Sequence, residues 1–380
     1  MEVMTEQLDD FETQAMETHQ LDEEDDFEKL LDEFISNASF GLVKADDEEE
    51  DFEEKEEEDE EEDGLDDFDP DLEDYPEGTV KFNENNCVKV EVLKPLREPR
   101  KELEKLVGCQ NIKQQINDLL LFSTYNKWMV IEHPGWKEHD VSLHAIFFGK
   151  PGTGKTTVCK IYGSLLKEAG MLSKGHVVVC SRGTFLGSNW GDEEKAVRQV
   201  LEMAQGGVLM IDEAYLLNSA HPNDPGKMVI PMLMEILANE QHRDIAIVLC
   251  GYKEPMQKLL DLNAGLASRF PHRYEFADFT VDELMEITRR RVSEYRYHFT
   301  RAAWTKYRSL LTEAYAKRDA NTWGNARFVA NLLEHIYLLH AKRCVRHIAM
   351  SPSKSIKCFA ITPADVQPIE VPQPKRRVGF

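Results

Sequence analysis

Residues 143–156 read LHAIFFGKPGTGKT, an apolar run followed by a glycine-rich loop. The loop, Gly149–Thr156, matches the pattern G-x-x-x-x-G-K-[S/T] at every fixed position, and a helical segment is expected at Thr157–Lys167. Glycines let successive backbone N–H groups curl around an anion, and the N-terminus of the following helix adds positive potential. The stretch therefore predicts a phosphate-binding loop between a buried strand and a helix.

The residue types of the loop suggest individual roles. Lys155 is expected to reach the β- and γ-phosphates of a nucleotide as a point charge, and the Thr156 hydroxyl is a hard oxygen ligand for Mg²⁺. These residues make ATP and Mg²⁺ the expected substrate and metal. The expected nucleotide contacts are Gly149, Lys150, Pro151, Gly152, Thr153, Gly154, Lys155, Thr156 and Thr157.

A second apolar run ends in two adjacent carboxylates. Residues 206–213 read GGVLMIDE, which predicts a buried strand followed by Asp212 and Glu213. Because parallel strands present their carboxyl ends at one edge of a sheet, we expect these acids to lie beside the phosphate loop. Asp212 is then expected to hold Mg²⁺, directly or through water, and Glu213 to polarise the attacking water as a general base.

Five apolar runs alternate with helical segments between residues 143 and 276. Buried parallel strands read as continuous apolar runs, and their alternation with helices indicates a wound α/β fold. The expected architecture is a five-stranded parallel sheet. Its strands are predicted at Leu143–Phe148, His176–Cys180, Val208–Ile211, Ile245–Cys250 and Tyr274–Phe276.

The segments on either side of this α/β region differ from it. Residues 79–100 predict a hairpin of Thr79–Phe82 with Val88–Val92, and a helical stretch from Glu102 to about Trp128 is interrupted at Gly108. After residue 278 the strands are expected to stop. Thr280 with Glu283 is a capping-box pattern, and helical segments are predicted at 302–318 and 325–347, followed by a mostly extended tail at 350–380.

Charge is distributed very unevenly along the chain. The net charge of −25 combines residues 1–80, with 37 acidic and 3 basic side chains, and residues 81–380, with 33 acidic and 42 basic ones. Residues 1–78 are therefore predicted to be a disordered acidic arm. Apolar residues at helical spacing within it predict a short amphipathic helix at 26–36, either transient or a docking segment. The opposite charges of arm and body suggest that the arm regulates the body.

Several classes of protein are disfavoured by what the sequence does not contain. No run of eighteen apolar residues is present, and the acidic N-terminus is unlike a secretion signal, so we expect a cytoplasmic protein without a membrane partner. The seven cysteines form no CxxC pair, and the twelve histidines show no metal-ligand spacing such as HExxH. We therefore expect reduced thiols and no structural zinc site.

A set of linked motifs resembles the AAA+ ATPases, specifically the CbbX/CfxQ (SpoVK-like) subgroup, over roughly residues 101–348. Besides the phosphate loop, the similar segments are Gly207–Tyr215, Gly251-Tyr252 with Met256, Asn263–Phe270 and Gly324–Arg327. The resemblance implies an AAA+ nucleotide-binding domain at 101–277 and a helical lid at 278–349.

The resemblance also implies roles for individual residues. Arg269 corresponds to the arginine finger that reaches the nucleotide of a neighbouring subunit, and Arg327 to the sensor-2 arginine that reports hydrolysis to the lid. Leu106-Val107-Gly108 resembles the segment that packs against adenine, which makes Val107 and Gly108 the expected adenine contacts. Tyr252 falls near the sensor-1 position, where a core aromatic is an equal alternative. Lys155, Glu213 and Arg269 are thus the expected catalytic residues.

Three positions depart from the pattern of the subgroup. Trp190 lies one place later than the aromatic residue of the central-pore loop, so it either grips a polypeptide or packs within its loop. Ala264 stands where proline is usual, and Ala330 where the lid often has arginine. These departures weaken any transfer of the Rubisco-activase substrate.

The resemblance implies a ring, expected to be a hexamer, that couples ATP hydrolysis to remodelling of a protein partner. An alternative is a nucleotide-gated adaptor that binds partners through the acidic arm without threading them. A DNA-associated loader is a third hypothesis. However, the Lys and Arg residues of residues 81–380 are dispersed, and no helix-turn-helix or other element that contacts bases in a DNA groove is evident. Nucleic acid is therefore not the expected partner.

Overall fold

The computed structural model describes residues 78–83, 86–133, 135–137, 139, 141–187, 191–218, 221, 224–237, 244–261, 264–319, 322–350 and 358–371. The acidic arm with its predicted helix at 26–36, Trp190 and the basic end of the tail lie outside these residues. The described chain divides into two compact units. The larger is built mainly from residues 78–291 and 311–332, and the smaller from 292–310 and 333–369.

A six-stranded sheet forms the centre of the larger unit. Its order is β3 (Glu91–Leu93), β5 (Val177–Cys180), β6 (Val208–Ile211), β7 (Ala246–Gly251), β4 (Ala145–Gly149) and β8 (His272–Phe276). Strands β4 to β8 are parallel to one another and confirm the five predicted strands. The expected count of five was wrong by one strand, because β3 adds an antiparallel edge to β5.

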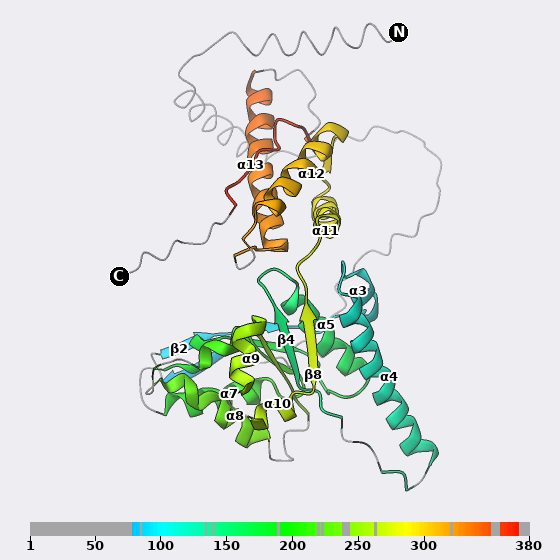
Figure 1. The fold of residues 1–380 in the computed structure, drawn as a ribbon, viewed down its shortest axis with the longest axis vertical. Coiled ribbons are helices and arrows are strands. Elements are labelled where there is room, and N and C mark those ends of the chain that lie inside the picture. The colour runs from blue at the N-terminus through cyan, green and yellow to red at the C-terminus, as the bar shows by residue number, and fades with distance from the viewer. Residues whose placement is uncertain are drawn as a thin grey trace, which may run out of the picture. The chain divides into compact units, whose positions relative to one another are not determined.

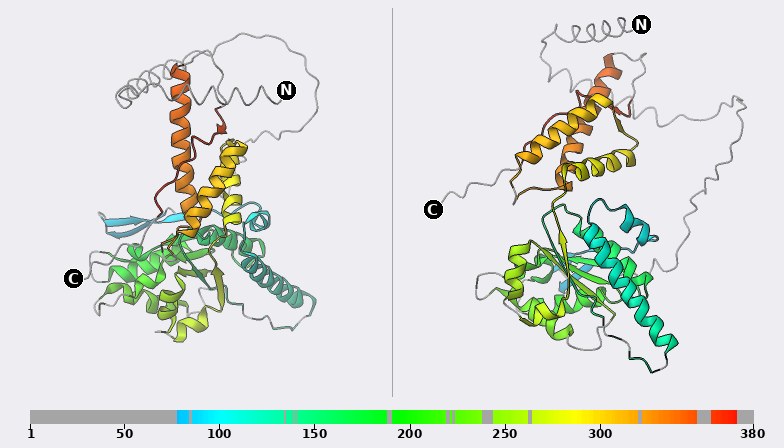
Figure 2. Two further views of the ribbon diagram at one scale, coloured as in Figure 1. Left: turned by 45° about the horizontal axis from the view of Figure 1, so that its top comes forward. Right: turned by 45° about the vertical axis from the view of Figure 1, so that its right-hand side comes forward.

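Helices cover both faces of this sheet (Figures 1 and 2). Alternate strand residues contribute to two cores, since successive side chains of a strand point to opposite faces. Ile146 and Leu209 pack with α7 (Asp192–Met203), α8 (Val229–Leu237) and α9 (Lys253–Asp261), whereas Phe147 and Met210 pack with α3 (Pro99–Lys105), α4 (Gln110–Glu132) and α5 (Lys155–Glu168). The sheet is therefore buried between two helical layers, as its continuous apolar strands predict. The shorter helices are α6 (Arg182–Phe185), η2 (Ala214–Leu217), η3 (Pro225–Met228) and α10 (Ala264–Arg269).

The predicted hairpin at 79–92 forms in part. Strand β1 (Thr79–Asn83) pairs antiparallel with β2 (Asn86–Lys89), but β2 ends before Val90. The Val90 amide donates to the Gly78 carbonyl at 2.8 Å, and the chain beyond it leaves the hairpin to pair with β5 as β3. One predicted strand is thus two, because Glu91–Leu93 find partners in the main sheet.

The predicted helix break at Gly108 is confirmed. Between α3 and α4, Gly108 and Cys109 have φ angles of 66° and 57°. A Cβ on Gly108 would lie 2.3 Å from Glu283 Oε1, so a larger side chain would be both strained and crowded there.

Residues beyond 278 are mainly helical, as predicted, in α11 (Val281–Glu294), α12 (Arg301–Ala316) and α13 (Ala326–Met350). The expectation that strands stop was wrong. In the smaller unit β9 (His298–Phe299) pairs parallel with β10 (Ala360–Ile361). The buried Asp365 carboxylate fixes the tail beside this pair: it accepts hydrogen bonds from the Arg343 guanidinium, at 2.7 and 2.9 Å, and from the Thr362 amide at 2.8 Å.

The capping box that opens α11 is confirmed and supports a stability prediction. Glu283 Oε2 accepts from the Thr280 amide and hydroxyl, and the Glu283 amide donates to Thr280 Oγ1 at 3.3 Å. We expect Thr280→Ala to lower the free energy of unfolding by about 1 kcal/mol and Thr280→Ser to change it by a few tenths at most. Urea unfolding measures both, and equal effects of the two substitutions would contradict a capping role for the hydroxyl.

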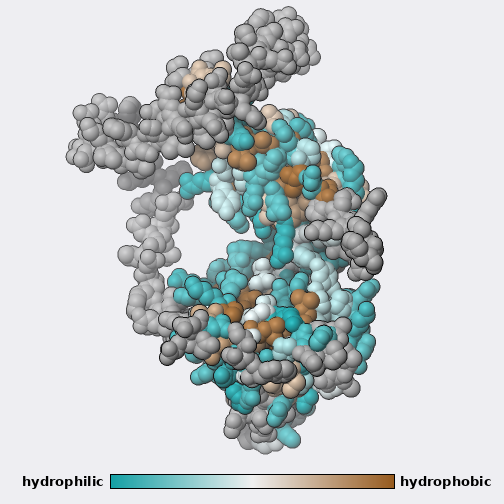
Figure 3. Space-filling model, turned by 90° about the vertical axis from the view of Figure 1, so that its left-hand side faces the viewer, coloured by the Kyte–Doolittle hydropathy of each residue, from teal (hydrophilic) through white to brown (hydrophobic). Residues whose placement is uncertain are grey.

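No described helix combines the length and the apolar composition that crossing a membrane requires. On the face drawn in Figure 3, hydrophilic residues cover much of the described surface and hydrophobic ones lie in small patches.

Candidate nucleotide-binding site

The sheet order brings the two predicted halves of the site to one edge. The phosphate loop follows β4, and Asp212 and Glu213 follow β6. Strand β7 lies between β4 and β6 and ends at Gly251, with Tyr252 directly after it. Adjacent strands are about 4.8 Å apart, so the loop and the carboxylates begin about 10 Å from each other. This spacing suits a triphosphate lying between them.

A pocket of about 210 Å³ lies at this edge. It gathers most of the predicted nucleotide contacts, the two predicted acids Asp212 and Glu213, and four further residues, Gly251, Tyr252, Arg291 and Ala326. The lining residues are Gly149, Pro151, Gly152, Gly154, Lys155, Thr156, Thr157, Asp212, Glu213, Gly251, Tyr252, Arg291, Ala326 and Arg327. Among the described residues, the predicted contacts Lys150, Thr153, Val107 and Gly108, and the predicted catalytic Arg269, are not part of this lining.

The Lys155 ammonium lies over the loop. Its Nζ donates to the backbone oxygens of Gly149 and Lys150 at 2.9 and 2.8 Å. Burial lowers the pKa of Lys155, because desolvation disfavours its charged form. An anion bound in the loop would give the buried Lys155 ammonium a partner of opposite charge in place of the water that burial excludes. The arrangement is therefore suited to binding phosphate.

The two acids occupy a turn that leaves the end of β6. Asp212 Oδ1 accepts the Glu213 amide at 3.0 Å, and Glu213 has a φ of 49°, which is uncommon for a residue with a side chain. Burial and then the nearby charge of Glu213 raise the pKa of Tyr215 to about 12. The Thr156 hydroxyl and the Asp212 carboxylate, both in the pocket lining, are oxygen donors of the kind Mg²⁺ prefers.

Asn325 joins the loop to the start of α13. Its buried amide Nδ2 donates to Asp278 Oδ1 at 3.0 Å and lies 3.4 Å from the Pro151 oxygen, while its Oδ1 accepts the Phe279 amide at 3.1 Å. Lys150 completes the network through an ion pair with Asp278 Oδ2 at 2.5 Å. The Lys150 side chain thus serves this network, and the expected contact of Lys150 with the nucleotide stays a prediction.

Asn325→Ala is expected to lower the free energy of unfolding by about 2–4 kcal/mol, because it leaves buried donors and acceptors without partners and removes a residue type that tolerates positive φ. The same substitution should weaken ATP binding, since the loop loses its contact with α13. Chemical unfolding and titration with a fluorescent ATP analogue measure the two effects. Asn331→Ala, at an exposed position six residues further along the chain in α13, is the matched control. Equal stability of the two variants would contradict the role of the network.

Gly152 lies against the turn that leads into α13. Its φ is 72°, and a Cβ there would lie 2.0 Å from the Gly324 oxygen and 2.9 Å from the Arg327 nitrogen. The Ala326 amide also donates to the Gly152 oxygen at 3.1 Å. These contacts bring Arg327, whose role came only from the resemblance, into the pocket.

Arg291 is a cation in the pocket that the sequence reading missed. It ends the run Arg289–Arg291 on α11, in which Arg289 and Arg290 pair with Glu286. Spacings of three and four residues from Glu286 account for these two arginines and leave Arg291 on another side of the helix. The position of Arg291 outside these pairs was the signal that the sequence offered. Its place beside the nucleotide pocket follows only from the fold.

Arg269 ends α10, immediately before β8. Within the described part of the chain, its guanidinium donates one long hydrogen bond of 3.4 Å to the Gly265 oxygen. The guanidinium is half-buried and is not part of the pocket lining of its own chain. Val107 and Gly108 lie at the junction of α3 and α4, where Gly108 faces Glu283 and Phe279 of the α11 region.

Comparison with known proteins places these features in a family. Residues 145–278 match the ATPase family associated with various cellular activities (AAA), and residues 280–376 match the AAA lid domain. Stage V sporulation protein K of Bacillus subtilis is 35% identical over 248 residues, which are 65% of this chain and 76% of that protein. The CfxQ homologue of Trieres chinensis is 36% identical over 242 residues, covering 63% and 81%.

The chloroplastic ribulose bisphosphate carboxylase/oxygenase activase of Cyanidioschyzon merolae is 31% identical over 266 residues, covering 70% of this chain and 87% of that protein. The resemblance read from the linked motifs is therefore confirmed, and so is the expectation of an enzyme that binds and hydrolyses ATP. The chain belongs to the AAA+ ATPases, within the subgroup of the CbbX and CfxQ proteins.

Proposed function

We propose that this chain is one subunit of a ring, expected to contain six copies, in which two neighbouring copies build each active site and ATP hydrolysis remodels a protein partner. One observation carries the proposal: the pocket contains the loop, Asp212, Glu213 and Arg327, while Arg269 of the same chain is not part of its lining. An arginine of this kind supplied by a neighbour would complete the pocket.

Within one chain, each side chain has a chemical task. Lys155 and the amides of the loop bind and orient the phosphates, and Glu213 accepts the proton of the attacking water as a general base. Thr156 and Asp212 are the residues that would hold Mg²⁺, which neutralises phosphate charge when bound. Tyr252 and Tyr215, whose rings are 5.9 Å apart, border Glu213.

The neighbour contributes charge. During phosphoryl transfer, negative charge spreads over the oxygens of the transferred group, and a positioned guanidinium stabilises it. Because the Arg269 guanidinium donates one long hydrogen bond among the described residues, reorienting it toward a nucleotide of the neighbour would break only a weak interaction. A single copy should therefore bind ATP and hydrolyse it slowly, and assembly should switch on turnover.

The link to a protein partner runs through the lid. Arg327 lies in the pocket, and the Asn325 network holds the start of α13 to the loop. Loss of the γ-phosphate would change the contacts of Arg327 and so bias the orientation of α13. One relative is named as an activase of an enzyme, which supports protein remodelling as the class of work. It does not identify the partner of this chain.

The dependence of specific activity on protein concentration tests this proposal. If two copies build each site, the rate of ATP hydrolysis per chain should rise with concentration, and its midpoint should coincide with the assembly measured by sedimentation. A rate per chain that is constant from fully dissociated to fully assembled protein would contradict it.

A further inference from the structure

The C-terminal half of α4 has an apolar outer side. In the first half of the helix, exposed positions carry polar residues such as Gln114 and Asn117. From Leu121 onward most of them carry large apolar ones, with exposed fractions of 71% for Leu121, 48% for Tyr125 and 51% for Trp128. These three recur at i, i+4 and i+7, so they form one stripe along the helix, away from the side that packs on the sheet. In Figures 1 and 2 this half of α4 extends past the sheet.

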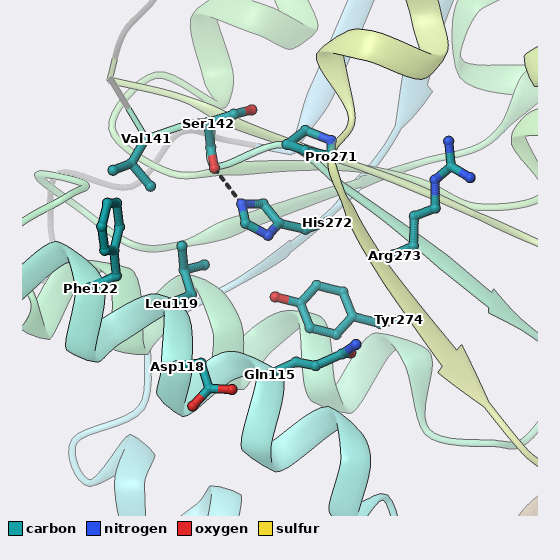
Figure 4. Close-up of a pocket in the computed structure, with 10 residues that line it drawn as sticks. All are labelled: Gln115, Asp118, Leu119, Phe122, Val141, Ser142, Pro271, His272, Arg273 and Tyr274. Atoms are coloured by element: carbon teal, nitrogen blue, oxygen red, sulfur yellow. Dashed lines mark hydrogen bonds between the residues drawn. The ribbon is translucent and has the colours of Figure 1, made fainter. Parts of the chain in front are cut away.

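A pocket of about 670 Å³ adjoins this stripe, between α4 and strand β8. Phe122, which is 45% exposed, belongs to its wall, together with Leu119 and Asp118 of the same helix. Figure 4 shows the Tyr274 hydroxyl and the His272 ring directed into it from β8, opposite Leu119 and Asp118, while Arg273 points away. The α4 wall of the pocket therefore combines apolar Leu119 and Phe122 with polar Gln115 and Asp118, and polar groups lie at its base.

The base of the pocket contains hydrogen-bonding groups in need of partners. Tyr274 is 1% exposed, yet its hydroxyl has no hydrogen-bond partner among the described residues. His272 Nε2 lies 2.7 Å from the Ser142 oxygen, and since a carbonyl only accepts, this nitrogen carries the proton and Nδ1 keeps a lone pair. A buried hydroxyl without a partner is costly, so the hydrogen bonds at the base of this pocket are incomplete among the described residues.

The stripe and the pocket adjoin Arg269. Ser142, in the pocket lining, donates its hydroxyl proton to the Arg269 backbone oxygen at 3.3 Å. Pro271, His272 and Tyr274, also in the lining, follow Arg269 within five residues. We call the surface made by Leu121, Phe122, Tyr125 and Trp128 with this pocket the α4–β8 face.

We propose that the α4–β8 face docks a second copy of this chain and forms the apolar part of the seam that Arg269 crosses. This inference rests on the proposed function, in which Arg269 reaches the nucleotide of a neighbour. A stable interface buries about 800 Å² on each partner, a patch roughly 30 Å across. A neighbour that receives Arg269 must then also cover the segments bonded to it, and these belong to the α4–β8 face.

The chemistry of the face agrees with this occupant. Exposed apolar patches mark interaction sites, and aromatic residues are enriched at the centres of interfaces. The seam is heterologous, because the α4–β8 face of one copy meets a different surface of the next, and such contacts close into rings when the rotation permits.

The test uses the full chain carrying Glu213→Gln, so that ATP stays bound while assembly is followed by sedimentation. Leu121→Gln with Trp128→Gln is expected to raise the protein concentration at half-assembly at least about tenfold, since both side chains leave an apolar interface. Binding of a fluorescent ATP analogue to the unassembled chain should stay within about twofold of its original affinity. The matched control is Gln114→Ala with Asn117→Ala on the polar half of α4. Half-assembly of the Leu121/Trp128 variant at the control concentration would overturn the proposal.

The two proposals fail differently. If Arg269→Ala stops hydrolysis but the Leu121/Trp128 variant assembles normally, the face assignment alone is wrong, whereas full activity of single wild-type chains would contradict the proposed function itself.

Discussion

Replacement of Glu213 by glutamine is expected to lower the rate of ATP hydrolysis by about 10²–10⁴-fold and to leave ATP affinity within about twofold. Glutamine has nearly the same shape but cannot accept the proton of the attacking water. Glu213 follows β6 in the pocket, and its backbone amide donates a hydrogen bond to the Asp212 carboxylate. Because this bond does not use the Glu213 side chain, the change should leave the turn intact. Phosphate release measures hydrolysis, and titration with a fluorescent ATP analogue measures affinity.

Glu254→Gln is the matched control, because Glu254 is an exposed acid in the first turn of α9. It should hydrolyse ATP at the wild-type rate. The Glu213→Gln protein should also remain assembled in ATP for longer than wild type, since the bound nucleotide persists. Wild-type turnover by the Glu213 variant would remove Glu213 from the mechanism.

Arg269→Ala is expected to reduce hydrolysis by about 10³–10⁵-fold in assembled protein, the range measured for arginine fingers in other phosphoryl-transfer systems. ATP binding should be nearly unchanged, because Arg269 is not part of the pocket lining of its own chain. Arg269→Lys should recover only a small part of the rate, since lysine keeps the charge but loses the planar fork of donors. The measurement is the hydrolysis rate at concentrations where sedimentation shows assembly.

Arg198→Ala controls for the loss of an arginine, because Arg198 is 67% exposed and pairs with Glu194 on the outside of α7. It should retain full activity. If Arg269→Ala matched this control, Arg269 would be an ordinary surface residue. Mixtures of wild type with Arg269→Ala should lose more activity than dilution accounts for, because each variant subunit disables the site of a neighbour.

The sequence predicted the elements of this fold that depend on interactions between residues close together in the chain. Continuous apolar runs located all five parallel strands, and the glycine pattern located the phosphate loop, because both signals depend on neighbouring residues. The capping-box pattern of Thr280 and Glu283 likewise predicted the start of α11. Asp212 and Glu213 were expected beside the loop from strand order alone, and they share its pocket.

Features that depend on distant partners were missed. Glu91–Leu93 form a strand because Val177–Val179 offer an open edge, and His298–Phe299 form one because Ala360–Ile361 return to them. No local pattern announces either pairing. Arg291 also depends on distant partners. Asn325 binds Asp278 and Phe279, which precede α11, and the direction in which α11 leaves them brings Arg291 to the pocket.

The resemblance supplied what spacing could not, but unevenly. Arg327 lies in the pocket as the resemblance implied, whereas Val107 and Gly108 lie elsewhere, at the α3–α4 junction against the α11 region. Their predicted contact with adenine stays a prediction, as do the roles of Arg269 and Trp190. A motif shared with a family transfers the geometry of the backbone more securely than the use made of each side chain.

The most direct test of a shared active site mixes two inactive variants. Lys155→Ala should bind ATP poorly but still offer Arg269 to a neighbour, and Arg269→Ala should bind ATP but lack the arginine that its neighbour needs. Each alone is expected to be inactive. In an equimolar mixture, every seam that joins an intact pocket to an intact arginine should hydrolyse ATP, so activity should reappear at a substantial fraction of the wild-type rate. If the co-assembled mixture stays as inactive as its two components, the active site is not built from two copies.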